Sequence, residues 1–280
     1  MIARMLGAAL RGLLVALMII TPALVLPDVS ADTTQITVLI ALLAFFLVFV
    51  EYNSVFPSII AFRDAPPINR LRFFALFLMV ILLTTICKGR TEVTLANSAI
   101  TSVATLIGDT LDFPYSPVRL VVLSIPAEAS AATVDLVRAA AGLTYALSLL
   151  AVAIFFALVR VFGWPSGRGA AFNVWINLPL FDPTAGGDAL HRMQRDARVA
   201  IALGCMLPFI IPALAKAAHD LVGPLSLDDS QSLIWILTAW AFLPASLIMR
   251  GIALTKIASM IQEKRRRTYA QDEDGGLSLA

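Results

Sequence analysis

The chain has 280 residues, of which 59% are hydrophobic and only 14% are charged. Soluble domains carry roughly 25% charged residues, so a water-soluble protein of this composition would expose large apolar patches. The formal net charge of +2 is too small to indicate a nucleic-acid partner. Composition therefore favours a membrane protein and argues against nucleic-acid binding.

Six charge-free apolar runs are long enough, alone or with flanking residues, to cross a bilayer as helices. A helix needs roughly 20 apolar residues to cross about 30 Å of hydrocarbon. The runs are apolar on every side and lack the alternation of barrel strands. The predicted fold is therefore all-α, a polytopic membrane protein whose single domain covers residues 1–280. The predicted spans are 12–27, 33–50, 73–87, 139–159, 199–215 and 230–249, with a cytoplasmic tail at 256–280.

The basic residues lie on alternate loops. With six spans, 16 of the 21 Lys and Arg residues fall on the side of the N-terminus. Because positive charge marks the cytoplasmic side, this predicts that both termini are cytoplasmic. Short loops and the lack of eukaryotic targeting signals favour the bacterial inner membrane.

The number of spans has two alternatives. Arg4 and Arg11 precede an apolar core and small residues follow at 29–31, so the first run could be a cleaved signal peptide. Residues 93–108 also lack charge, but a polar stripe faces an apolar stripe at helical spacing there. This pattern predicts an amphipathic helix lying on the surface, as part of an outer cap formed by 88–138. The apolar run 118–125 fits a short strand, a half-inserted segment or buried packing.

The inner loop 160–198 contains the candidate surface for a partner or for lipid headgroups. Trp at headgroup level and arginines at a helix start favour this interpretation, while a simple interfacial anchor is the alternative. Anionic headgroups and other membrane subunits are the expected partners. The candidate residues are Phe172, Trp175, Asn177, Arg192, Arg195 and Arg198.

The sequence offers no catalytic, cofactor-binding or metal-binding motif, so we expect none of these sites and lean against an enzyme. His191 and His219 are predicted on opposite sides of the membrane, where they cannot join one metal site. The ionisable residues at span ends are expected at the interfaces rather than at membrane depth. They are Glu51 on the inner side and Lys216, His219 and Asp220 on the outer side.

Pro208 and Pro212 lie four residues apart in the fifth span and predict a kink, which could gate a pathway or simply bend the helix. Small residues four apart, such as Gly142 and Ala146 or Ala8 and Gly12, predict close helix packing.

Three functions remain open from the sequence. The first is a non-catalytic subunit, scaffold or assembly factor of a membrane complex. The second is a transporter or channel for small solutes or lipids that uses the kinked fifth span. The third is a lipid enzyme, which would need Asp182, Asp188 and His191 to meet at the inner interface.

Overall fold

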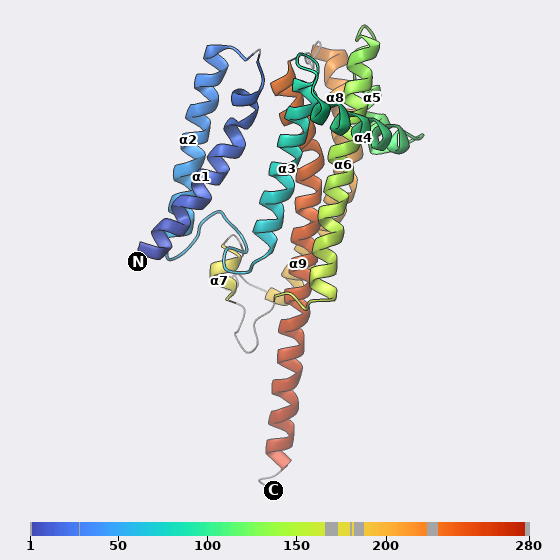
Figure 1. Cartoon of the computed structure of the whole chain (residues 1–280). Coiled ribbons are helices and arrows are strands. Elements are labelled where there is room, and N and C mark those ends of the chain that lie inside the picture. Colours follow the sequence, from blue (N-terminus) through green and yellow to red (C-terminus); the bar gives the residue numbers. More distant parts are fainter. Residues whose placement is uncertain are drawn as a thin grey trace.

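The computed structural model describes residues 2–27, 29–165, 173–179, 181, 188–222 and 229–277. Within these ranges the chain forms helices and no strand (Figure 1). Six of the helices are long and apolar enough to cross a membrane, which confirms the predicted polytopic all-α fold. The helices are α1 (Ile2–Val25), α2 (Ala31–Asn53), α3 (Ile68–Lys88), α4 (Leu95–Leu111), α5 (Pro117–Leu123), α6 (Ala131–Arg160), α7 (Val174–Asn177), α8 (Ala189–Val222) and α9 (Ser230–Leu277).

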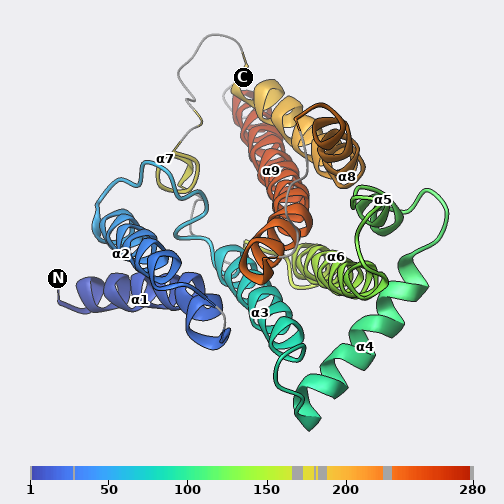
Figure 2. The same cartoon turned by 90° about the horizontal axis from the view of Figure 1, so that it is seen from above.

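The spans are arranged as a bundle with a hairpin beside it. Helices α3, α6 and α9 form the centre, α8 packs along α9, and α1 and α2 form the hairpin at one edge (Figure 2). Helix α1 begins and α9 ends on the same side of the bundle, which we call the terminal side (Figure 1). The opposite side is the distal side.

Two apolar clusters fill the bundle. The larger cluster lies toward the distal side, where Leu83 of α3 and Leu237 of α9 are almost fully buried. The second lies toward the terminal side around Phe155 and Met249. A buried hydrogen bond of 3.0 Å from Gln231 Nε2 to Thr37 Oγ1 also ties α9 to the hairpin.

Close backbone approach at glycine joins α4 to the bundle. A Cβ on Gly142 of α6 would lie 2.4 Å from the Cα of Gly108 in α4. The small-residue spacing at Gly142 thus serves packing inside this chain. Gly12 does the same in the hairpin, where an added Cβ would lie 2.8 Å from the carbonyl oxygen of Phe45.

The cap segment differs in detail from the prediction. Helix α4 lies across the bundle rather than along it (Figure 2), and it buries Ala104 and Gly108 against α6. The exposed side carries Leu95, Val103 and Leu106, because contact through glycine selects small residues for the buried face. Most of the undecided run 118–125 belongs to the short helix α5, which begins at Pro117 directly after its N-cap Ser116.

Most helices extend beyond the predicted spans, which ended at the first charge. Helix α1 already begins at Ile2, and α9 continues through the tail to Leu277. This extension includes the acidic residues Asp272, Glu273 and Asp274 near the end of the tail. It remains helical because residues 256–274 contain neither Gly nor Pro, and Glu263 pairs with Arg267 one turn away.

Candidate functional site

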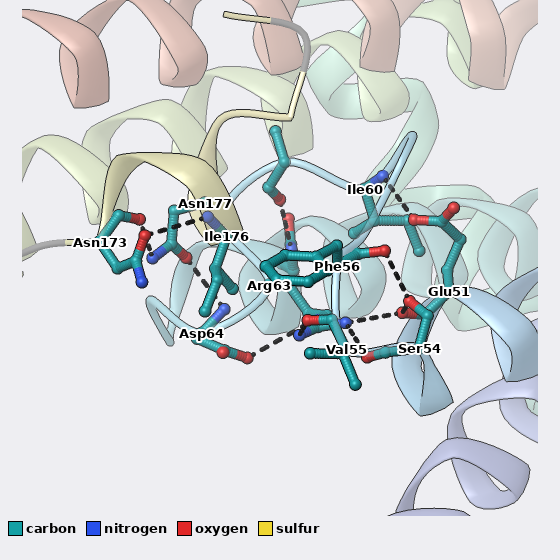
Figure 3. A network of polar contacts seen from close by, with 12 residues as sticks. Glu51, Ser54, Val55, Phe56, Ile60, Arg63, Asp64, Asn173, Ile176 and Asn177 are labelled. Carbon is teal, nitrogen blue, oxygen red and sulfur yellow. Dashed lines mark hydrogen bonds and ion pairs between the residues drawn. The ribbon is translucent and has the colours of Figure 1, made fainter. Parts of the chain in front are cut away.

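The most elaborate polar site lies on the terminal side, in the loop 54–67 that connects α2 to α3 (Figure 3). Glu51 in the last turn of α2 is only 5% exposed. Its carboxylate accepts bonds from the backbone N–H groups of Ser58 and Ile59, each 3.1 Å, and of Ile60 at 3.2 Å. The Ser58 hydroxyl donates a further bond. Three successive N–H groups thus converge on one buried carboxylate, as in an anion-binding nest.

Arg63 closes the same loop from its other end. Its Nη1 donates to the carbonyl oxygens of Glu51 at 2.9 Å and Ser54 at 2.8 Å, and its Nη2 donates to that of Val55 at 3.2 Å. The carbonyls at the end of α2 have no partner further along the helix, so the guanidinium acts as a C-terminal cap. Its Nε lies 3.4 Å from Asp64 Oδ1.

Asn177 joins this loop to α7. Its Oδ1 accepts from the N–H of Asp64 at 3.0 Å, and its backbone oxygen accepts from the N–H of Phe62 at 2.6 Å. The Asn177 Nδ2 donates to the oxygen of Asn173, whose own Oδ1 caps α7 at Ile176 (Figure 3). Asn177 is buried, so it belongs to the internal network rather than to a free surface.

Buried aromatic side chains pack beneath the loop 54–67. Phe62 is fully buried with a positive φ of 57°, and its ring meets that of Trp164 at 6.1 Å. The Trp164 ring also meets Phe155 of α6 at 5.3 Å. The indole Nε1 donates to the carbonyl oxygens of Ala65 at 3.3 Å and Pro66 at 3.1 Å. No sequence pattern indicates this role of Trp164.

A groove of about 850 Å³ opens beside the loop, between α1 and α3. Its polar lining includes three guanidinium groups, those of Arg11, Arg63 and Arg70, and one carboxylate, Asp64. Arg11 lies over the ring of Tyr52 at 4.8 Å. The site can therefore attract an anion, which the sequence analysis did not predict.

A further arginine points into the bundle rather than toward the interface. Arg72 Nη2 donates to the backbone oxygen of Ser246 in α9 at 2.6 Å. Arg72 therefore joins α3 to α9.

The remaining candidates of the inner loop are described only in part. Phe172 is outside the described residues, and Trp175 belongs to α7 with a side chain that is not described. Arg192 lies over the ring of Phe181 at 5.4 Å. Arg195 and Arg198 are exposed on the first turns of α8. Asn177 is thus buried in the network of the 54–67 loop, whereas Arg195 and Arg198 are exposed on α8.

The acid and histidine at the start of α8 form an exposed contact. Asp188 pairs with His191 at 2.9 Å and with Arg265 of α9 at 3.2 Å. The N–H of Leu190, followed by these two side chains, lowers the pKa of Asp188 below its ordinary value. Asp182 lies outside the described residues, and no group of three His, Cys, Asp or Glu that could hold a metal occurs in the described part of the chain.

The prolines of α8 are integrated into its contact with α9. In a helix the N–H of residue 212 would bond to the oxygen of residue 208, but Pro212 has no N–H. Trp240 Nε1 of α9 fills this gap with a bond of 3.1 Å to Pro208 O. The cavity beside Pro212 is only about 70 Å³ and is lined mainly by apolar residues such as Ile211 and Leu237.

Replacing Trp240 with Phe should leave the Pro208 oxygen without a donor and lower the free energy of unfolding by about 1–2 kcal/mol. Pro212→Ala restores an N–H at the right position, so it should recover most of this loss in the Trp240→Phe background. Thermal unfolding in detergent of the two single variants and the double variant measures the coupling. Additive effects would contradict the assignment of this bond.

The distal charges lie at the end of α8. Lys216 is exposed, and His219 and Asp220 are in the helix with side chains that are not described.

Comparisons of the chain with known protein families, curated proteins and solved structures find no match.

Proposed function

We propose that this protein is a non-catalytic subunit, scaffold or assembly factor of a complex in the bacterial inner membrane. Both termini are assigned to the cytoplasm, so the terminal side is the inner side. The distribution of Lys and Arg supports this orientation, since 16 of the 21 basic residues fall on that side when six helices span the membrane.

The observation that carries the proposal is the extension of α9. The helix reaches Leu277, far beyond the end of the bundle (Figure 1), and every side chain from 262 to 269 is exposed. In its described part this polar segment makes one side-chain contact with the rest of the chain, the pair of Arg265 with Asp188, and tertiary packing supplies most helix stability in proteins. A partner surface on the cytoplasmic side would supply that packing.

The terminal-side network favours a structural role over catalysis. Glu51, Arg63 and Asn177 all bond to backbone groups of this chain. A catalytic carboxylate needs access to a substrate, whereas Glu51 is buried by the loop that it holds.

Transport through the kinked helix has less support. That hypothesis requires a polar cavity near Pro208 and Pro212, and the described residues there enclose only a small apolar one. The bond from Trp240 to Pro208 further indicates that the kink serves packing between α8 and α9.

The test is purification in mild detergent with and without the far end of α9. The full chain should emerge with a partner protein, and a chain ended after Thr268 should lose it. This variant retains the basic cluster Lys264–Arg267 and the contact of Arg265 with Asp188, so its fold and topology should be unchanged. A full-length protein that elutes alone and monodisperse would refute the proposal.

The orientation has its own test. In a Cys205→Ser background, a cysteine placed at Arg266 should resist a membrane-impermeant thiol reagent in intact cells and react after lysis. Labelling in intact cells would reverse the assigned topology.

A further inference from the structure

The groove between α1 and α3 combines two kinds of lining. Its walls are apolar, and the three guanidinium groups of Arg11, Arg63 and Arg70 lie at its terminal-side end with Asp64 as the one carboxylate. The ribbons of α1 and α3 diverge toward the terminal side (Figure 1), and the groove is lined by residues of both helices. Its volume of about 850 Å³ falls within the range of sites for small molecules.

The apolar walls indicate an occupant with a hydrocarbon part. Leu14 and Val15 of α1 face Phe73 and Phe74 of α3 across the groove. Because both helices span the membrane, a lipid chain can enter between them from the side. A small soluble anion would make no use of these walls.

The charges indicate an anionic headgroup. Arg63 is held by three backbone oxygens and by Asp64, so it contributes mainly its charge. Arg70 is exposed and forms no hydrogen bond or ion pair with any residue in the described part of the chain. Arg11 is oriented by the Tyr52 ring and by a 2.7 Å bond to the oxygen of Gly7. Two guanidinium groups thus remain able to bind a phosphate bidentately.

We propose that this groove binds one anionic phospholipid from the leaflet on the terminal side. Arg11 and Arg70 bind its phosphate, and one acyl chain lies between α1 and α3 against Leu14 and Phe73. The positive balance of the lining selects an anionic lipid over a zwitterionic one. This site is independent of the partner assigned to the α9 extension, so either inference can fail alone.

The test measures lipid retained after the purified full chain is mixed with vesicles of phosphatidylglycerol or phosphatidylcholine, re-extracted and analysed by native mass spectrometry. The wild type should retain one phosphatidylglycerol per chain and little phosphatidylcholine. Arg11→Gln with Arg70→Gln should weaken retention by about thirtyfold, from roughly fivefold per charge near a membrane surface. The competing headgroup surface suggested by the sequence is tested by Arg195→Gln with Arg198→Gln, which removes the same charge from α8; if the lipid binds in the groove, retention in this control should be unchanged.

Each contrary result overturns the proposal. Equal retention of both lipids would show that the groove does not select lipids by charge. Weaker retention by the α8 control would show that the lipid binds at the α8 surface instead. Displacement of the lipid by millimolar inorganic phosphate would make the groove a site for a free anion. If the double variant unfolds, Arg70→Gln alone decides, because Arg70 is exposed and forms no hydrogen bond or ion pair in the described chain; unchanged retention would then refute the site.

Discussion

Replacing Glu51 with Ala should lower the free energy of unfolding by about 2–4 kcal/mol, since three N–H donors and a hydroxyl would lose their common acceptor. Ser58 and Ile59 are exposed, which keeps the loss below the sum for fully buried groups. The loop 54–60 should also become sensitive to protease. Thermal unfolding in detergent and limited proteolysis measure the two effects.

The variant Glu51→Gln tests whether the charge of the Glu51 side chain, rather than its size, stabilises the loop. The amide nearly preserves the shape of the side chain, but its NH₂ group would face N–H donors, so this variant should be destabilised almost as much as Glu51→Ala. The matched control is Asp64→Asn in the same loop, because that side chain is 55% exposed and makes only a long contact with Arg63. Its effect should stay below about 1 kcal/mol. A stable Glu51→Gln protein would show that the carboxylate does not organise the loop.

Adding one methyl group at Gly142 should displace α4 from α6. The new Cβ of Gly142→Ala would lie 2.4 Å from the Cα and 2.8 Å from the N of Gly108, and backbone atoms cannot rotate away. Overpacking of this kind costs about 1–3 kcal/mol. The ion pair between Arg138 Nε and Asp112 Oδ2, now 2.9 Å, should open with the movement of α4. A lower melting temperature and faster proteolysis within 89–116 are the expected readouts.

Gly7→Ala is the matched control for a methyl group on a helical glycine. Its Cβ would meet only the flexible end of Arg11, at 3.0 Å, so the melting temperature should be nearly unchanged. If Gly142→Ala behaves like this control, the crossing of α4 and α6 is looser than the structure describes.

Hydropathy was sufficient to predict the spans because a bilayer imposes a simple rule on length and polarity. It could not predict where helices continue into water, so α1 and α9 both exceed their predicted ends. Backbone propensity decides there, as the unbroken stretch 256–274 illustrates. The run 118–125 was undecidable for a related reason, since a run of eight residues with six apolar ones fits a strand or a buried helix equally well.

The terminal-side site was largely unpredictable. Glu51 stood out as a charge at a span end, but nothing in the sequence indicates that Ser58, Ile59 and Ile60 turn their N–H groups toward it. The sequence likewise gives no signal for the roles of Arg63 and Trp164. Their roles depend on tertiary contacts with α2 and with the 65–66 backbone, which no local pattern encodes. By contrast, the missing N–H of Pro212 was a usable signal for the donor that Trp240 provides.

Helix α9 is continuous from Ser230 to Leu277, which makes it a lever arm. The part beyond Arg250 is about 40 Å long at 1.5 Å per residue. Rocking the membrane-embedded part by about 10° would therefore swing the far tip by about 7 Å. Any change of tilt within the lipid, whether caused by bilayer thickness or by a neighbouring protein, is thus transmitted mechanically to whatever holds that tip.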